Sequence, residues 1–150
     1  SLAGHHRLNG FRAAMQEAGI ADVEAQIVRA ENLQEAAREA VRPLLMQRAD
    51  KRPTAILAVS DLMAIGVLNV AEELGLHVGR DLALVGFDDS PISRFLRPTL
   101  SSLAQPVEEV GERLIAMLAA LCNGNHLDPR EVLLTPTLVV RESSGFQREP

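Results

Sequence analysis

Aromatic side chains are scarce in this sequence, which contains four phenylalanines and neither tyrosine nor tryptophan. Nucleic acid bases and sugar rings are commonly held by stacking on exposed aromatic rings, and this chain offers few of them. We therefore expect any ligand to be held mainly by polar side chains.

Cysteine and lysine are just as scarce, and each occurs once, as Cys122 and Lys51. A single cysteine excludes a disulfide within the chain and suits a reducing compartment, so we expect a cytoplasmic location. The remaining basic residues are scattered arginines, and the formal net charge of -5 argues against a broad surface for nucleic acid. No apolar run approaches the roughly 18 residues needed to cross a bilayer, so we expect no membrane partner.

Motifs for catalysis and metal binding are also missing. The chain has no nucleophile elbow, Walker loop, C-x-x-C pair or H-E-x-x-H pair. His5 and His6 lack carboxylates or cysteines at ligand spacing, so we expect neither a metal nor another cofactor. Asp88 and Asp89 suggest an acid–base pair, but neighbours on an extended chain point to opposite faces. We expect no enzymatic activity, with a reaction that uses Asp88 as its base as an alternative.

What the sequence does contain is the composition of a globular protein, with 47% hydrophobic and 23% charged residues. Helical and strand-like patterns alternate along its first part, which favours a parallel sheet with right-handed crossovers and therefore an α/β fold. The expected elements are a helix at 8–18, a strand at 23–28, a helix at 33–46 that begins at Asn32 and bends near Pro43, a strand at 54–59, a helix at 62–74 and a strand at 82–85.

The pattern changes after Pro98. Residues 99–103 are expected to be extended, and Pro106 suits the start of a helix that ends at Asn123 and Gly124. Short strands are predicted at 132–134 and 138–140. The new helix has an apolar stripe that needs a sheet to cover it, and the strands that follow are too short to do so. We therefore expect the chain to be a fragment of a longer protein. The stripe consists of Val107, Val110, Leu114, Met117 and Leu121.

The predicted helix at 62–74 is apolar on nearly every side, with Asn69, Glu72 and Glu73 as its polar positions. A helix that packs on one face of a sheet needs a single apolar stripe. The helix is therefore expected to contact a second partner, and a homodimer is the economical choice. The alternative is that another part of the same chain covers it.

Polar residues follow each of the three predicted strands, as Asn32, as the pair Ser60 and Asp61, and as the pair Asp88 and Asp89. Because the carboxyl ends of parallel strands share one edge of a sheet, these residues are expected to converge on a ligand cleft. Taken singly, Asn32, Ser60 or Asp61 would also serve as a helix cap, and Asp88 as a turn former.

Arg7 stands at the start of the first predicted helix. Its guanidinium is a two-pronged donor that suits a pair of hydroxyls, a carboxylate or a phosphate. The alternative for Arg7 is an ordinary solvated arginine on the surface.

Several motifs, in order and without large gaps, resemble the effector-binding core of LacI/GalR-type transcriptional regulators. They cover nearly the whole chain, and together they are far more specific than any one of them. The motifs are RLNGF at 7–11, RPTAI at 52–56, SDLMAIG at 60–66, VGFDD at 85–89, PTL at 98–100, QP at 105–106 and PTLVVRES at 136–143.

The resemblance implies a type I fold like that of periplasmic sugar-binding proteins, with two α/β lobes and an effector in the cleft between them. The chain would then supply an incomplete C-terminal lobe at 1–104, a helix and strand that belong to the N-terminal lobe at 105–136, and a return to the C-terminal lobe with the tail at 137–150. The implied function is to sense a small effector, a sugar or sugar derivative, and to form a homodimer. Operator DNA would be bound by a headpiece that is absent from this chain. The alternative is a periplasmic sugar-binding protein of a transport system.

The resemblance also implies roles for individual residues. Asn32 stands where many members have an aromatic residue that stacks on the ligand, and Ser60 replaces a common asparagine. The implied effector contacts are Arg7, Asn32, Ser60, Asp61, Asp88 and Gln105. The implied dimer interface consists of Leu62, Met63, Val67, Val70, Ile92, Phe95 and Leu96.

Overall fold

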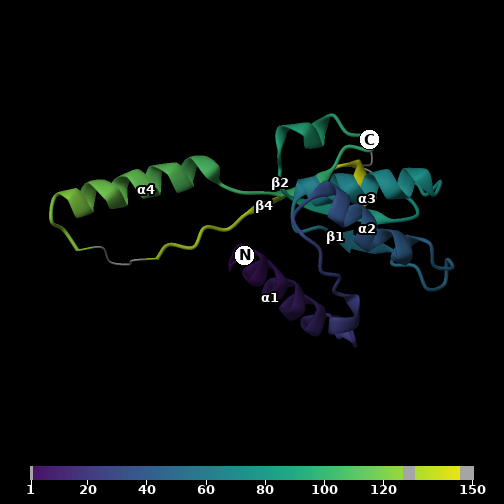
Figure 1. The fold of residues 1–150 in the computed structure, drawn as a ribbon. Helices are drawn as coiled ribbons and strands as arrows, with labels where there is room; N and C mark the ends of the chain where they lie inside the picture. The colour runs from purple at the N-terminus through teal and green to yellow at the C-terminus, as the bar shows by residue number, and fades with distance from the viewer. Residues whose placement is uncertain (1, 127–130, 146–150) are drawn as a thin grey trace.

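The computed structural model describes residues 2–126 and 131–145. A four-stranded sheet lies at the centre, with helices α2 and α3 stacked on it and helix α4 extending away (Figure 1). The elements in these ranges are α1 (Leu2–Glu17), the 3-10 turn η1 (Val23–Gln26), α2 (Gln34–Leu45), β1 (Ala55–Leu57), α3 (Asp61–Glu73), β2 (Ala83–Asp88), the 3-10 turn η2 (Pro91–Arg94), β3 (Ser101–Ala104), α4 (Val107–Cys122), β4 (Thr137–Val139) and the 3-10 turn η3 (Glu142–Ser144).

The strand order in the sheet is β1-β2-β3-β4. The first three strands run parallel, with Leu57 opposite Val85 and Val85 opposite Ser101. Strand β4 joins β3 in the antiparallel direction, with Leu103 opposite Leu138. The predicted α/β fold with a parallel sheet is therefore confirmed, and the carboxyl ends of β1, β2 and β3 lie at one edge.

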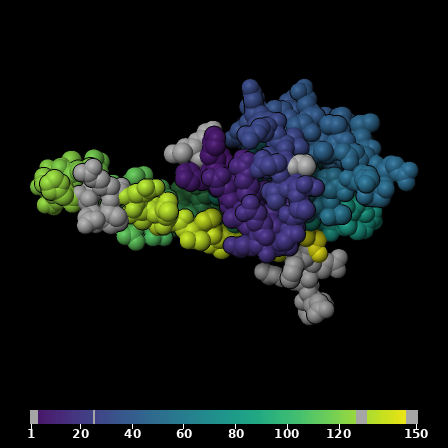
Figure 2. All heavy atoms as spheres, turned by 90° about the horizontal axis from the view of Figure 1, so that it is seen from below, coloured from purple at the N-terminus to yellow at the C-terminus, as the bar shows by residue number. Residues whose placement is uncertain are grey.

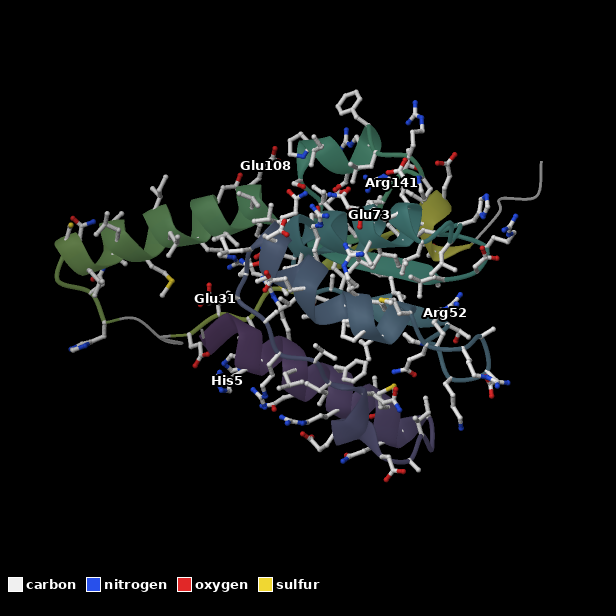
Figure 3. All side chains as sticks on the ribbon, turned by 45° about the vertical axis from the view of Figure 1, so that its right-hand side comes forward. His5, Glu31, Arg52, Glu73, Glu108 and Arg141 are labelled. Carbon is white, nitrogen blue, oxygen red and sulfur yellow. The ribbon has the colours of Figure 1, made fainter. Side chains whose placement is uncertain are left out.

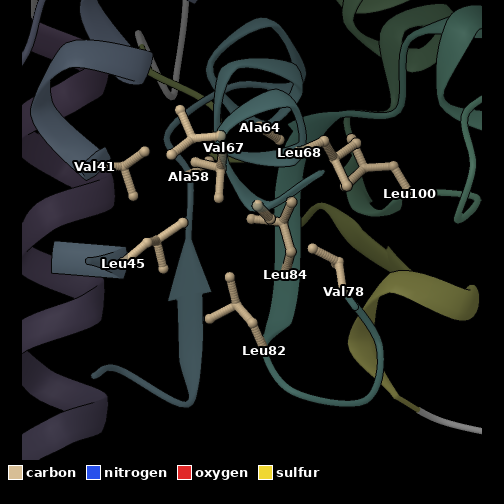
Figure 4. Packing of buried hydrophobic residues seen from close by; sticks show 12 residues of the cluster. Val41, Leu45, Ala58, Ala64, Val67, Leu68, Val78, Leu82, Leu84 and Leu100 are labelled. Atoms are coloured by element: carbon tan, nitrogen blue, oxygen red, sulfur yellow. The ribbon is translucent and has the colours of Figure 1, made fainter. Parts of the chain in front are cut away.

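Helix α3 is covered on two sides by its own chain. It packs on the sheet through contacts with β2, while α2 lies against its other side (Figure 4). Gly66 allows the close crossing, because a Cβ atom there would collide with the Gln34 carbonyl and press on Ala37. The fully buried residues of this layer include Val70, Ala71, Leu45 and Leu84.

This packing corrects two of the predicted dimer contacts. Val67 and Val70 are 4% and 0% exposed because they face the core between α2 and the sheet. Met63 and Leu96 are partly buried and pack against the same core. The apolar residues of α3 are thus mostly explained by the alternative that part of the same chain covers the helix.

Three local predictions differ from the structure. The strand predicted at 23–28 is absent: residues 23–26 form the turn η1, in which Arg12 of α1 donates two hydrogen bonds to Glu24, at 2.6 and 2.9 Å, and holds it beside the helix. Helix α2 begins after Leu33, and Asn32 does not cap it. Residues 132–134 are not a strand, because β4 pairs with β3 only after Pro136, which has no N–H to donate.

Helix α4 and residues 131–136 project from the rest of the molecule (Figure 2). None of its residues is buried, and its apolar stripe faces solvent. A groove of about 430 Å³ lies between α4 and residues 131–136. The predicted helix is therefore present, and the described residues cover its apolar stripe only in part. Among those residues, no helix is both long and apolar enough to span a bilayer. The exposed apolar residues of α4 are Val107, Val110, Leu114, Ile115, Leu118 and Leu121.

Candidate ligand-binding site

A polar cluster lies at the carboxyl edge of the sheet, with Asp88 at its centre. Asp88 ends β2, and its Oδ1 atom accepts a hydrogen bond of 2.7 Å from Nε2 of Gln105, the first residue after β3. The same oxygen lies 3.7 Å from Nη2 of Arg7 on α1. The structure thus brings together three of the predicted residues from three separate elements.

Arg7 is held in place by contacts beyond Asp88. Its Nη1 atom donates a hydrogen bond of 2.5 Å to the carbonyl of Val59, just after β1. Its guanidinium carbon also lies 3.7 Å from the centre of the Phe87 ring, a cation–π contact. Arg7 is therefore not an ordinary solvated arginine, since its Nη1 atom bonds to the chain just after β1 and its Nη2 atom faces the end of β2.

Asn32 and Ser60 form a second polar pair next to this edge. The Ser60 hydroxyl donates to Oδ1 of Asn32 at 2.5 Å and accepts a bond of 3.3 Å from the backbone N–H of Met63. Ser60 is therefore the N-cap of α3, as one of its two predictions stated. Because Ser60 is buried and Asn32 is exposed, Asn32 is the member of the pair that faces solvent.

Asp61 is set apart from the cluster, although it follows Ser60 directly. It is 2% exposed, and both carboxylate oxygens accept hydrogen bonds inside the protein. Asp89 also turns away from Asp88, since its Oδ1 atom lies 2.6 Å from Nη2 of Arg141, which is labelled in Figure 3. The predicted opposite orientation of Asp88 and Asp89 is therefore what the structure shows.

The backbone at this edge is strained. Asp88 and Asp89 have φ angles of 111° and 48°, in the left-handed region that residues other than glycine seldom adopt. Such conformations cost of order 1–3 kcal/mol and persist where the surrounding contacts hold them. The contacts of Asp88 with Gln105 and of Asp89 with Arg141 hold this turn, so the cluster has a defined geometry.

The chemistry of the cluster suits binding of a polar, uncharged molecule. The charges of Arg7 and Asp88 cancel, and together with Asn32 and Gln105 they supply several donors and acceptors at one edge. In the ranges that the structure describes, no three histidine, cysteine or acidic side chains lie close enough to hold a metal ion.

Two features of the site escaped the prediction. Phe87 supplies the ring beneath Arg7, and its position in the sequence beside Asp88 would have been the only sign of this. Ser90, Ser93 and Ser102 surround Asp61. Their separation from Asp61 along the chain leaves no local pattern that could have revealed them.

Exposed apolar residues occur on and beside the turn η2 and at the start of α3, two segments that the hydrogen bond from Ser93 to Asp61 joins. Phe95 is 76% exposed, and Ile92 and Leu62 are exposed as well. These three residues, which we call the η2 patch, are the part of the predicted dimer interface that reaches the surface.

Comparisons with known proteins give matches over nearly the whole chain. Residues 2–144 match the periplasmic binding protein-like domain family. The HTH-type transcriptional repressor PurR of Yersinia pestis bv. Antiqua (strain Antiqua) is 36% identical over 140 residues, which cover 93% of this chain and 40% of the repressor. The chain therefore spans less than half the length of this relative.

Solved structures give the same result. A regulatory protein of the LacI family from Chloroflexus aggregans superposes with a TM-score of 0.88 and 41% identity, over 95% of this chain and 50% of that protein. The transcriptional regulator CelR in complex with cellobiose superposes with a TM-score of 0.83 and 34% identity, over 93% and 42%. These relatives are regulators and not transport proteins, which favours the main prediction over the alternative. The chain belongs to the periplasmic binding protein-like domain family, as part of the effector-binding core of LacI/GalR-type transcriptional regulators.

Proposed function

We propose that this chain forms one wall of a cleft that binds a sugar or sugar derivative and reports its presence to a DNA-binding headpiece in the cytoplasm. The observation that carries the proposal is the cluster of Arg7, Asp88 and Gln105 at the carboxyl edge of the sheet. A sugar presents adjacent hydroxyls, which both donate and accept. An arginine fork and a carboxylate side by side satisfy such a pair without leaving a net charge unpaired.

The cluster has the character of a binding site and not of a catalytic one. Oδ1 of Asp88 already accepts a hydrogen bond from Gln105 and faces Arg7, so this oxygen is occupied by donors of the protein itself. The relatives described above are regulators, and one of them holds cellobiose. We therefore propose recognition of an effector without its chemical conversion.

Gln105 is placed where ligand binding could change the arrangement of the two lobes. It stands between the end of β3 and the start of α4, at the point where the chain leaves the sheet. We propose that residues 1–104 form one lobe, that 105–136 pack on a second lobe and that 137–150 return. A ligand that bridges Asp88 and the second lobe would favour one arrangement of the lobes, provided that it binds that arrangement more tightly.

The η2 patch is proposed to contact a second copy of the chain. Its three exposed apolar side chains are costly to leave in water, and a two-fold contact would cover the same residues on both copies. The regulator would then present two headpieces to operator DNA. Phe95→Ser is expected to weaken the dimer about tenfold or more, measured by sedimentation equilibrium. An equal dimer constant in the variant would refute this part of the proposal.

The binding proposal is tested by ligand titration of the regulator that carries this chain, with cellobiose as the first probe and a panel of other sugars and nucleosides after it. Arg7→Ala is expected to lower the affinity for the best probe about tenfold to a hundredfold, because it removes a charged donor from the cluster.

Arg12→Ala is the matched control, since Arg12 lies on the same helix and pairs with Glu24 away from the cluster. It should leave the affinity within about twofold. Equal losses in both variants, or none in Arg7→Ala, would sink the assigned role of Arg7.

A further inference from the structure

Asp61 is the most heavily hydrogen-bonded side chain of the described core. Its Oδ2 atom accepts three bonds, from the Ser90 N–H at 2.7 Å, the Ser90 hydroxyl at 2.9 Å and the Ser93 hydroxyl at 2.8 Å. Its Oδ1 atom accepts one from the Ser102 hydroxyl at 2.6 Å. A buried carboxylate needs donors of this kind, because an unpaired one would be strongly destabilising.

The four bonds tie together separate parts of the fold. Ser90 is the residue before the turn η2, Ser93 lies in η2, and Ser102 belongs to β3. The Ser102 hydroxyl also accepts a bond of 3.0 Å from the backbone N–H of Asp89. Gly86 leaves room for the carboxylate, because a Cβ atom at that position would collide with Oδ1 of Asp61. The glycine in β2 therefore leaves the space that the Asp61 carboxylate occupies.

The segments that Asp61 joins carry the polar cluster around Asp88 and the η2 patch. On one side, Ser102 holds the strained turn of Asp88 and Asp89, and Asp88 is the centre of the polar cluster. On the other side, Ser93 lies in η2 between Ile92 and Phe95, the exposed residues of the η2 patch. A single buried carboxylate lies between the ligand cluster and the patch.

We propose that Asp61 is a positioning residue that makes the Asp88–Asp89 turn and the η2 patch move as one unit. The proposal rests on the proposed function for the meaning of the two surfaces. It has a specific consequence, which is that loosening the bond on one side of the carboxylate loosens the structure on the other side. An aspartate that only filled space would show no such transfer.

The test is amide hydrogen exchange of the 150-residue chain, followed by NMR. Ser102→Ala removes the bond on the β3 side, and Ser93→Ala removes the bond on the η2 side. The reporters are the N–H groups of Ser93 and Phe95, which bond to the carbonyls of Ser90 and Ile92, and the N–H of Asp89.

In Ser102→Ala, exchange at Ser93 and Phe95 is expected to speed up about tenfold, although neither amide touches Ser102. In Ser93→Ala, exchange at Asp89 is expected to speed up by a similar factor. Asp61→Asn should speed up all three. If each serine variant affected only its own side, or if Asp61→Asn left all three rates within about twofold, the proposal would be overturned.

Ser143→Ala is the matched control, because Ser143 is another fully buried serine, bonded to Ser101 and Leu84 and not to Asp61. It is expected to lower the urea midpoint while changing the three rates by no more than that global loss. If it reproduced the transfer seen in Ser102→Ala, the effect would be general loosening and the proposal would fail. Should Asp61→Asn not fold, the two serine variants decide. No ligand is needed, so a failure of sugar binding would refute the proposed function and leave this result unaffected.

Discussion

At the scale of single residues, the neighbouring aspartates Asp88 and Asp89 have different surroundings and different roles. Asp88 faces Arg7 and Gln105 at the exposed edge, whereas Asp89 is held between Ser102 and Arg141. The sequence predicts this split, because consecutive residues at the end of a strand point to opposite faces. What it does not predict is the left-handed backbone at both positions, which depends on partners from distant segments.

Gly66 carries a prediction at the same scale. A Cβ atom there would collide with the Gln34 carbonyl and press on Ala37, so Gly66→Ala is expected to destabilise the chain by about 1–3 kcal/mol in urea unfolding. Gly10→Ala is the control. Gly10 lies in the exposed part of α1 with nothing within 4 Å, so alanine should stabilise by up to about 1 kcal/mol. A Gly66→Ala variant that is as stable as the parent chain, or more stable, would show that α2 and α3 do not cross as closely as described.

At the scale of elements, the return of the chain after α4 is anchored by a short polar segment. Ser143 is fully buried; its hydroxyl donates to the carbonyl of Leu84 at 2.7 Å and accepts from the N–H of Ser101 at 2.8 Å. Glu142 accepts two bonds from Thr99, from its N–H at 2.8 Å and its hydroxyl at 3.0 Å. These bonds hold β4 and η3 on the sheet, although the strand itself is three residues long.

The anchoring by Glu142 predicts a dependence of stability on pH. The Thr99 N–H and hydroxyl lower the pKa of Glu142 in the folded chain, because they bond to its charged form. A carboxylate with a lowered pKa stabilises the fold above its unfolded value, which is about 4.3, and this contribution is lost as the pH falls through the folded value. Glu142→Gln is therefore expected to flatten the fall of the urea midpoint below about pH 4.3.

The control for this prediction is Glu112→Gln, which removes one carboxylate from α4, far along the chain from the sheet contacts of Glu142. The prediction fails if the two variants give the same curve of stability against pH.

At the scale of the whole molecule, the chain has a packed body and an uncovered arm. Leu114 on the apolar stripe of α4 and Leu118, one turn further along the helix, are 61% and 62% exposed, values that are unusual for leucines of an amphipathic helix. The relatives extend well beyond the matched region, so a second lobe is the proposed cover. Without this second lobe, the exposed apolar stripe is expected to promote self-association of the chain.

Replacing Leu114 and Leu118 together by lysine is therefore expected to lower the binding of an apolar dye and the light scattering of the isolated chain. The urea midpoint of the packed body should stay nearly unchanged, because exposed side chains on the arm contribute little to its stability. A large loss of stability would mean that α4 packs on the body in solution and would contradict the exposed arm.

The local patterns were sufficient for much of the fold. The parallel sheet, the end of α3 shortly before Gly75 and the helix after Pro106 all follow from periodicity and from glycine and proline signals. The strand expected at 23–28 is absent, because this segment pairs with none of the four strands of the described sheet and its Glu24 is bonded to Arg12 of α1. Ion pairs between distant residues leave no trace in periodicity.

The sequence by itself determined the order of elements and the gathering of polar residues at one edge, because strand direction and chain order decide where the ends of parallel strands lie. Only the tertiary structure decided which of these residues face solvent. Asp61 and Asp88 both follow a strand, yet Asp61 is buried by serines 29, 32 and 41 positions away. Likewise, α3 is apolar on all sides, so its pattern selects no face, and the packing of α2 made Val67 and Val70 core residues while Leu62 stayed at the surface.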